Sequence, residues 1–179
     1  MRLLLHCCCA PCSVSCVKNL RGEGFTPELF WFNPNIHPST EYVSRRDCLK
    51  KFAADEKLDL KTADEYSVKL FLNAVPPDTE RCKKCYSLRL EKTASFAAQE
   101  GYTAFTTTLL ISPYQDHEEI KRVGEEEAAK YGVDFLYRDF RPLFREGQSA
   151  ARAAGMYIQK YCGCIFSEEE RYAKKEEKI

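Results

Sequence analysis

The chain has 179 residues, of which 44% are hydrophobic and 12% aromatic, so it is long enough and apolar enough to build one globular core. It carries 27 basic and 27 acidic side chains, and this balance excludes a generally basic surface of the kind that coats nucleic acid or membranes. Ten cysteines are unusual in a domain that is large enough to fold without disulfides.

The first residues bear on the compartment in which these cysteines would lie. The apolar run that begins at Met1 ends at His6, which is shorter than the about 7–15 apolar residues of a signal peptide. No other stretch approaches the roughly 18 apolar residues of a membrane span. We therefore expect a cytoplasmic protein without membrane association, in which thiols stay reduced. Clustered cysteines in that setting more often bind metal or do redox chemistry than form disulfides.

Short apolar segments alternate with helical patterns along the chain. Strands are predicted at 2–8, 28–32, 104–110 and 133–139, with a weaker one at 59–62. Apolar residues at helical spacing predict helices around 42–53, 90–97 and 120–131. The alternation predicts an α/β fold, a Rossmann-like parallel sheet of about 4–5 strands with helices on both faces. We expect one domain over 1–179, with a charged helical tail at about 167–179.

A cysteine cluster follows the first predicted strand. Residues 6–12 read H-C-C-C-A-P-C and lead into a predicted helix, where nucleotide-binding α/β domains place a glycine-rich loop. The chain has no motif for ATP or NAD binding. A helix N-terminus stabilises thiolates, the form of cysteine that ligates metals. Ligands of parallel sheets bind at the carboxyl ends of the strands, so we expect a metal site there.

Two further pairs of cysteines lie far along the chain. Cys82 and Cys85 form a C-x-x-C motif, which serves as a redox dithiol, as half of a zinc site or as two iron–sulfur ligands. Cys162 and Cys164 flank Gly163, which lets the backbone fold tightly around a bound group. We expect the three groups to share one metal centre. Their thiols exceed the four ligands of one zinc ion or one iron–sulfur cluster, which implies a second metal or a redox-active dithiol.

Polar side chains after the predicted strands are candidates for other roles. His37, Tyr114 and Asp116 are candidate proton donors by their placement, although such residues are also common in ordinary turns. The candidate RNA contacts are basic residues in two local runs: Lys83, Lys84, Arg89, Arg141 and Arg145. A charged, solvated helix face is the commoner explanation of such runs.

The motifs together resemble the QueH-type epoxyqueuosine reductases. The resemblance spans nearly the whole chain and rests on H-C-C-C-A-P-C at 6–12, N-P-N-I-H-P at 33–38, E-Y at 41–42, R-C-K-K-C at 81–85, R-L-E-K-T-A at 89–94, F-T-T-T-L-L-I-S-P-Y at 105–114, D-F-R at 139–141 and Y-C-G-C at 161–164. It implies two-electron reduction of epoxyqueuosine to queuosine at the wobble position of the tRNA anticodon, without cobalamin. That reaction is the last step of queuosine biosynthesis.

The same resemblance implies cofactors, partners and ligands. The cofactors are a 4Fe-4S iron–sulfur cluster and an additional iron ion beside it, and the partners are tRNA bearing epoxyqueuosine and an external electron donor. The cysteines that match the motifs of the family are Cys8, Cys9, Cys12, Cys82, Cys85, Cys162 and Cys164. Cys7 stands at a position that we take to be variable, whereas Cys16 and Cys48 lie outside the motifs. The sequence leaves open which cysteines hold the cluster and which hold the iron.

Two other classes of function compete with the reductase. One is a zinc-stabilised RNA-binding module without catalytic activity. The other is a thiol–disulfide oxidoreductase that works through Cys82 and Cys85. Iron and sulfide content would separate the first from a reductase, and substitution of cysteines outside the C-x-x-C motif would separate the second.

Overall fold

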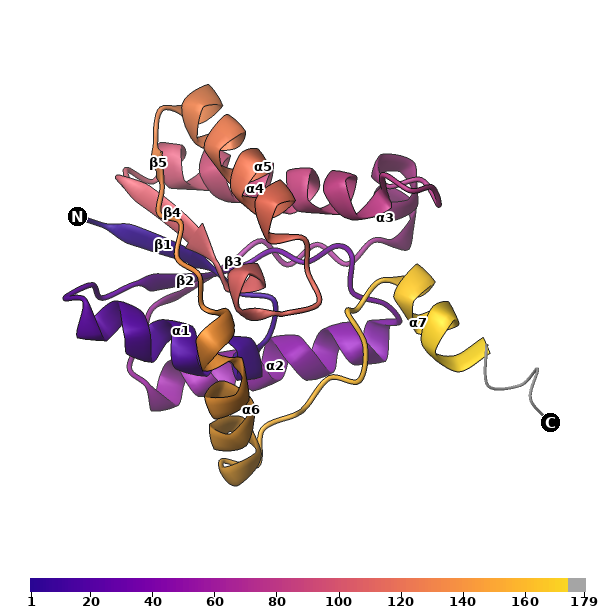
Figure 1. Cartoon of the computed structure of the whole chain (residues 1–179), viewed down its shortest axis with the longest axis horizontal. Helices are drawn as coiled ribbons and strands as arrows, with labels where there is room; N and C mark the ends of the chain where they lie inside the picture. Colours follow the sequence, from indigo (N-terminus) through magenta and orange to yellow (C-terminus); the bar gives the residue numbers. More distant parts are fainter. Residues whose placement is uncertain (174–179) are drawn as a thin grey trace.

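The structure, a computed structural model, describes residues 1–173, whose five strands form one parallel sheet between layers of helices (Figure 1). Across the sheet the order is β3-β2-β1-β4-β5. The strands are β1 (Leu3–His6), β2 (Glu28–Trp31), β3 (Leu60–Thr62), β4 (Ala104–Thr107) and β5 (Asp134–Phe135). In β1, Leu5 pairs with Leu29 on one side and with Thr106 on the other. The predicted α/β fold is thus confirmed, and each predicted strand segment contains one strand.

Helices cover both faces of the sheet. One face carries α1 (Ala10–Gly22), α2 (Ser39–Asp55) and α6 (Phe144–Ala153), and the other carries α4 (Arg81–Gln99) and α5 (His117–Tyr131) (Figure 1). Two short helices, α3 (Val68–Ala74) and α7 (Ile165–Tyr172), lie beyond the carboxyl ends of the strands. The helices predicted around 42–53, 90–97 and 120–131 correspond to α2, α4 and α5, and the helix predicted after the first cysteine cluster corresponds to α1. The predicted tail overlaps α7, and its residues 174–179 lie outside the described part of the chain.

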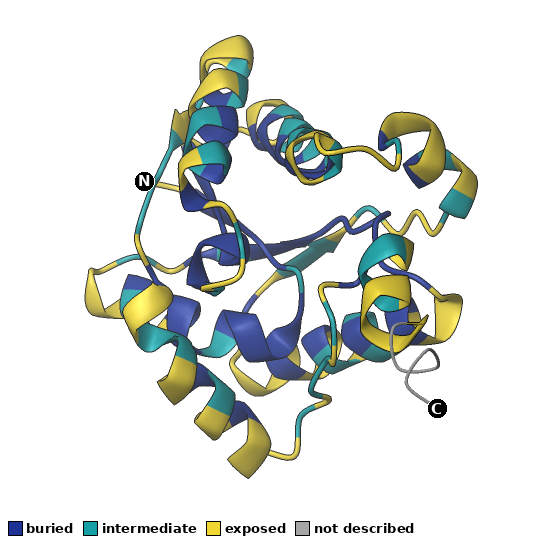
Figure 2. Cartoon of the chain, turned by 45° about the vertical axis from the view of Figure 1, so that its right-hand side comes forward, coloured by how far each residue is buried: buried dark blue, intermediate teal, exposed yellow. Residues whose placement is uncertain are grey.

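The core explains why the first strand is uniformly apolar instead of alternating. Leu3, Leu4 and Leu5 have almost no exposed surface, because helices cover both faces of β1 (Figure 2). Phe30 on β2 and Phe105 on β4 are also fully buried. Within residues 1–173, no helix is long and apolar enough to cross a membrane.

Four of the strands end before their predicted segments do, and the differences are largest at β4 and β5. After Thr107 the chain turns into a 3₁₀ helix (Thr108–Ile111), because the Thr107 hydroxyl accepts a hydrogen bond from the Leu109 N–H at 3.2 Å. β5 has only two residues, since the chain leaves the sheet after Phe135. Because β1 and β4 are neighbours in the sheet, the loops that follow them lie side by side. The strand order reverses direction between these two strands. Such a switch point is the usual ligand site of an open parallel sheet.

Candidate metal centre

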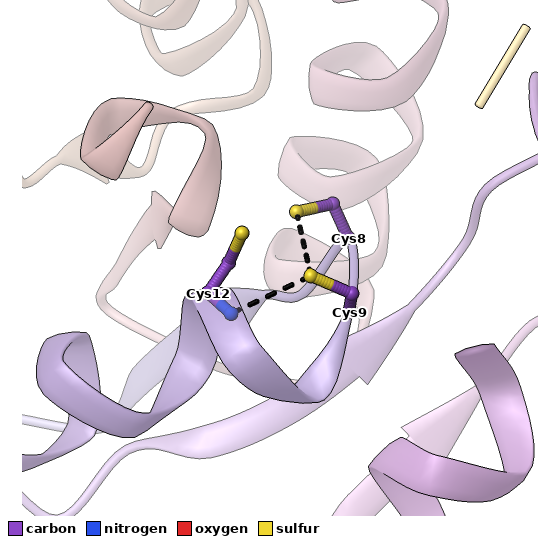
Figure 3. A group of neighbouring side chains, drawn as sticks. All are labelled: Cys8, Cys9 and Cys12. Carbon is purple, nitrogen blue, oxygen red and sulfur yellow. Dashed lines mark hydrogen bonds between the residues drawn. The ribbon is translucent and has the colours of Figure 1, made fainter. Parts of the chain in front are cut away.

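The first three cysteines gather at this switch point, and we call them the three-cysteine group. The sulfur atoms of Cys8, Cys9 and Cys12 lie within 4.8 Å of one another, and they point toward one another from the end of the β1 loop and the first turn of α1 (Figure 3). The Cys9 sulfur caps α1 by accepting a hydrogen bond from the Cys12 N–H at 3.4 Å. A tetrahedral ion with metal–sulfur bonds of about 2.3 Å holds its sulfurs roughly 3.8 Å apart. The spacing therefore suits one metal ion.

The surroundings of Cys8 favour its thiolate. Hydrogen bonds with Cys12 and Cys9 hold the pKa of Cys8 well below its usual range, and the nearby Arg89 guanidinium lowers it further. The Thr108 hydroxyl donates to the Cys8 sulfur at 3.3 Å and accepts from the Cys8 N–H at 3.0 Å. Because Thr108 follows β4 and Cys8 follows β1, these contacts join the two sides of the switch point. A metal-ligating thiolate is the chemical state that this geometry stabilises.

Cys7 points away from this group. Its thiol donates to the Leu5 carbonyl at 3.3 Å, it has no exposed surface, and burial raises its pKa to about 12. The Asn33 amide also donates to the Cys7 carbonyl at 2.9 Å, which fixes the backbone where the loop begins. Cys7 is therefore a neutral core side chain.

The remaining four candidate ligands, which we call the four-cysteine group, line a second and smaller cavity: Cys82, Cys85, Cys162 and Cys164. Cys82 and Cys85 lie in the first two turns of α4, whereas Cys164 caps α7 by accepting from the Ser167 N–H at 3.3 Å. Burial raises the pKa of Cys85 to about 12, so its thiolate needs a compensating cation such as a metal. The N-terminal ends of α1, α4 and α7, which carry partial positive charge, thus all hold cysteines.

A cavity of about 480 Å³ connects the two groups. Cys8 and Cys12 line it from one side and Cys162 from the other. The other lining residues are Arg45, Arg89, Thr108, Leu109, Ser112, Tyr114, Gln115, Phe144, Gln148, Gln159, Lys160, Tyr161 and Arg171. Four of them are cations and none is a carboxylate, so this main cavity suits an anionic ligand although the chain has no net charge.

Arg45 ties the cysteine loop at 161–164 to α2. Its guanidinium is 1% exposed, donates to the carbonyls of Tyr161 at 3.0 Å and Cys162 at 2.9 Å, and pairs with Glu41 at 2.6 Å. Gly163 has a φ of +130°, and a Cβ there would lie 3.1 Å from Arg45 Nη1. Only glycine adopts this backbone conformation without strain and leaves room for the Arg45 side chain. The glycine of the Y-C-G-C motif is therefore required by the structure, whereas the cysteines are required by the chemistry.

Arg89, selected above as an RNA contact, is instead buried between the two cysteine groups. It is 2% exposed and lines both cavities. One terminal nitrogen donates to Asn33 Oδ1 at 2.8 Å, whereas Nε has no hydrogen-bond partner among residues 1–173. A buried cation at this place balances negative charge on the surrounding sulfurs.

Two glutamines that the sequence analysis did not select also contact the thiols. Gln159 Nε2 donates to the sulfurs of Cys9 at 3.0 Å and Cys12 at 3.5 Å. Gln115 Nε2 donates to the Cys162 sulfur at 3.5 Å, and its oxygen accepts from the Tyr86 hydroxyl at 2.7 Å. The only sequence signal for either is position, since Gln115 follows a predicted strand and Gln159 precedes the Y-C-G-C motif.

The three candidate proton donors occupy different places. Tyr114 lies at the main cavity with 84% of its surface exposed. Asp116 caps α5, where its carboxylate accepts from the Glu119 N–H at 3.0 Å, and it does not line the main cavity. His37 is 2% exposed and lines a separate cavity of about 230 Å³, and burial lowers its pKa.

The other candidate RNA contacts lie on the surface. Lys83, Lys84 and Arg141 each pair with a carboxylate on their own segment, at 3.3, 3.6 and 2.7 Å. Arg145 is exposed on α6, next to Phe144 of the main cavity, and has no ion pair within residues 1–173. The charges of the first three are therefore already balanced by neighbours.

Fold and site together define an α/β protein with two groups of cysteines, three and four in number, which a cavity with four cations on its wall connects. The family model described as epoxyqueuosine reductase QueH matches residues 3–170. An epoxyqueuosine reductase QueH of Dehalococcoides mccartyi is 37% identical over 97% of this chain and 96% of its own length, and one of Thermotoga maritima is 36% identical over 96% and 93%. The chain belongs to the epoxyqueuosine reductase QueH family and is an oxidoreductase, as the motifs predict.

A more distant likeness is confined to the fold. A solved structure of a predicted subunit of tRNA methyltransferase from Methanocaldococcus jannaschii superposes with a TM-score of 0.55 and covers 98% of this chain and 88% of that one. The two chains are 14% identical. This similarity independently supports the α/β architecture described above.

Proposed function

We propose that this chain is a single-domain cytoplasmic enzyme that reduces epoxyqueuosine to queuosine in the anticodon of tRNA. The observation that carries the proposal is the family match over residues 3–170, because it includes all seven candidate cysteine ligands. The main cavity of about 480 Å³ falls within the usual range of about 300–1,000 Å³ for small-molecule sites, and so has room for a modified base. The family match also favours a reductase over a zinc module or a dithiol oxidoreductase.

The two cysteine groups fit two different metal sites. The four-cysteine group supplies the four thiolates that a 4Fe-4S cluster takes. The three-cysteine group has the close sulfur spacing of a single ion and leaves one tetrahedral position without a cysteine ligand, which fits the additional iron. When bound, the cluster would supply single electrons and the iron would supply Lewis acidity.

The side chains of the cavity have their own parts in this reaction. Reduction of an epoxide to an alkene consumes two electrons and two protons and releases the oxygen as water, and an external donor must provide the electrons. Arg89 balances the charge of both thiolate groups and holds Asn33, which in turn fixes the backbone at Cys7. Tyr114 is the proposed proton donor, because it alone of the three candidates lines the main cavity. His37 and Asp116 would have to act from outside it.

The tRNA would approach through the open side of the main cavity. An unpaired base splayed out of the anticodon loop fits a recognition mode that is common for RNA. The exposed cationic side chains of the cavity wall would face the phosphates that accompany such a base. Lys83, Lys84 and Arg141 stay proposed contacts, but each would have to exchange its carboxylate partner for a phosphate.

An anaerobic turnover assay tests the proposal. Iron-replete enzyme, a chemical reductant and tRNA bearing epoxyqueuosine are incubated, and the nucleosides of the digested tRNA are separated and identified by mass. We expect queuosine from the wild-type enzyme and none from Cys8→Ala or Cys85→Ala. A colourless preparation that holds only zinc and forms no queuosine would instead support the RNA-binding module.

A further inference from the structure

Another cavity, which is open to solvent, adjoins the main one. It has a volume of about 460 Å³ and is lined by Lys160, Tyr161, Cys162, Ser167, Glu170 and Arg171. Four of these residues also line the main cavity: Lys160, Tyr161, Cys162 and Arg171. The two cavities are therefore continuous over the Tyr161–Cys162 segment, and we call the one that runs out along α7 the outer groove.

The charges in this groove differ from those elsewhere on the surface. Lys160 and Arg171 have no ion-pair partner among residues 1–173, whereas the carboxylate of Glu170 pairs with Arg81 at 2.5 Å. Lys83 and Lys84 on α4, by contrast, are both paired. A phosphate can therefore bind Lys160 and Arg171 without displacing a carboxylate of residues 1–173. Since the net charge is zero, such local cations are what attracts a polyanion.

The groove is also held in a fixed position. Arg45 binds the carbonyls of Tyr161 and Cys162, and the Tyr161 hydroxyl donates to the His37 carbonyl. Lys160 immediately precedes this anchored segment, and Arg171 lies on α7 at the other wall. The two cations thus extend from a rigid base beside the thiols of the main cavity.

We propose that the outer groove binds the sugar-phosphate backbone next to epoxyqueuosine, with Lys160 and Arg171 on the flanking phosphates. This inference rests on the proposed function, because it places the modified base in the main cavity. One phosphodiester joins the ribose of the modified base to the ribose of the adjoining nucleotide, so that nucleotide must lie at the rim of the main cavity. The groove is the continuation of the cavity that presents unpaired cations there. Epoxyqueuosine within RNA would then bind more tightly than the free nucleoside, which lacks these phosphates.

The test compares RNA with a substrate that has no phosphates. Lys160→Gln, Arg171→Gln and the double variant are compared with Lys50→Gln, which changes an exposed lysine of α2. Lys50 lines neither the main cavity nor the outer groove and has no ion pair among residues 1–173. An anticodon stem-loop carrying epoxyqueuosine is titrated at several salt concentrations. Each single-stranded phosphate contact contributes a slope of about 0.7 to the salt dependence, so we expect the double variant to lose about 1.4.

The kinetic part of the test separates binding from chemistry. For the double variant we expect KM for the stem-loop to rise by roughly tenfold, which corresponds to the loss of two charged contacts of about 0.7 kcal/mol each, with kcat unchanged. Turnover of free epoxyqueuosine nucleoside should be unaffected, and iron content should match the wild type. An unchanged salt slope, or an effect as large in Lys50→Gln, would overturn the inference. Because affinity is measured apart from turnover, a chain that binds through the groove but forms no queuosine would refute only the proposed function.

Discussion

The buried guanidinium of Arg45 determines where two of the thiols lie. It bonds to Glu41 and to two carbonyls of the cysteine loop, with 1% of its surface exposed. No motif marks it, because an arginine in an amphipathic helix normally faces solvent. Sequence could predict the cysteines, whose clustering is itself the signal. It could not predict the side chains that hold them, such as Arg45 and Gln159, since these act through contacts between distant segments.

We predict that Arg45→Met destabilises the protein by about 3–5 kcal/mol, because Glu41 keeps the Tyr157 hydroxyl as a donor but stays buried without its cationic partner. Denaturant unfolding under anaerobic conditions measures the loss. Arg46→Met on the same helix is the matched control, since its ion pairs with Asp47 and Asp64 are more exposed and should contribute about 1 kcal/mol or less. Equal losses for the two variants would contradict the structural role of Arg45.

The neighbouring cysteines at positions 7 and 8 should behave differently. Cys7→Ala should retain the iron of the wild type, because the Cys7 thiol bonds to a backbone carbonyl in the core. Cys8→Ala should lose iron, because its sulfur is one of three within 4.8 Å of one another. Iron per chain, measured after anaerobic reconstitution, compares the two. Loss of iron from Cys7→Ala together with a normal thermal transition would show that Cys7 is a ligand.

At the scale of the elements, loops from distant parts of the chain make the site. The H-C-C-C-A-P-C segment caps α1, the C-x-x-C segment opens α4 and the Y-C-G-C segment caps α7. Strand positions were predictable because L-L-L in β1 and L-F-W in β2 are buried on both faces. Strand ends were not, because the exit of β4 depends on the side-chain bond of Thr107. How the cysteines divide between two groups depends on where α7 docks, which no local pattern encodes.

The division into two groups predicts two different metal contents. Cys85→Ala removes a ligand from the four-cysteine group and should lose most acid-labile sulfide. Cys9→Ala removes one from the three-cysteine group and should keep the sulfide while it loses about one iron per chain. Iron and sulfide analysis of both reconstituted variants is the measurement. If Cys9→Ala lost all its sulfide, the assignment of the cluster to the four-cysteine group would be wrong.

The turn at Gly163 predicts a second effect at this scale. Gly163→Ala strains a left-handed backbone and places a methyl group 3.1 Å from Arg45 Nη1, so the loop that carries Cys162 and Cys164 must shift. Gly155→Ala is a control with φ of +66° and open space around it, where only backbone strain of about 1–2 kcal/mol applies. We expect Gly163→Ala to lose cluster absorbance in the visible range and Gly155→Ala to keep it. Similar spectra for both would show that the close approach at Gly163 does not matter.

Over the whole molecule, charge and chemistry are concentrated at one edge of the sheet. The net charge of zero excludes attraction by the surface as a whole, yet the cavity that joins the cysteine groups has four cations and no carboxylate on its walls. Composition could indicate that RNA must be bound locally. It could not locate the place, because the basic run at 81–92 is largely paired or buried and the groove cations lie outside it.

The central claim is that this chain passes two electrons to an epoxide through metals held by its cysteine groups. Single turnover tests it most directly: anaerobic, iron-replete enzyme is reduced, excess reductant is removed, and a known amount of tRNA bearing epoxyqueuosine is added. We predict queuosine at one molecule for every two electrons lost by the enzyme, with reoxidation seen in the visible spectrum at the same rate. Reoxidation without queuosine, or queuosine formed equally by enzyme stripped of iron, would contradict the account.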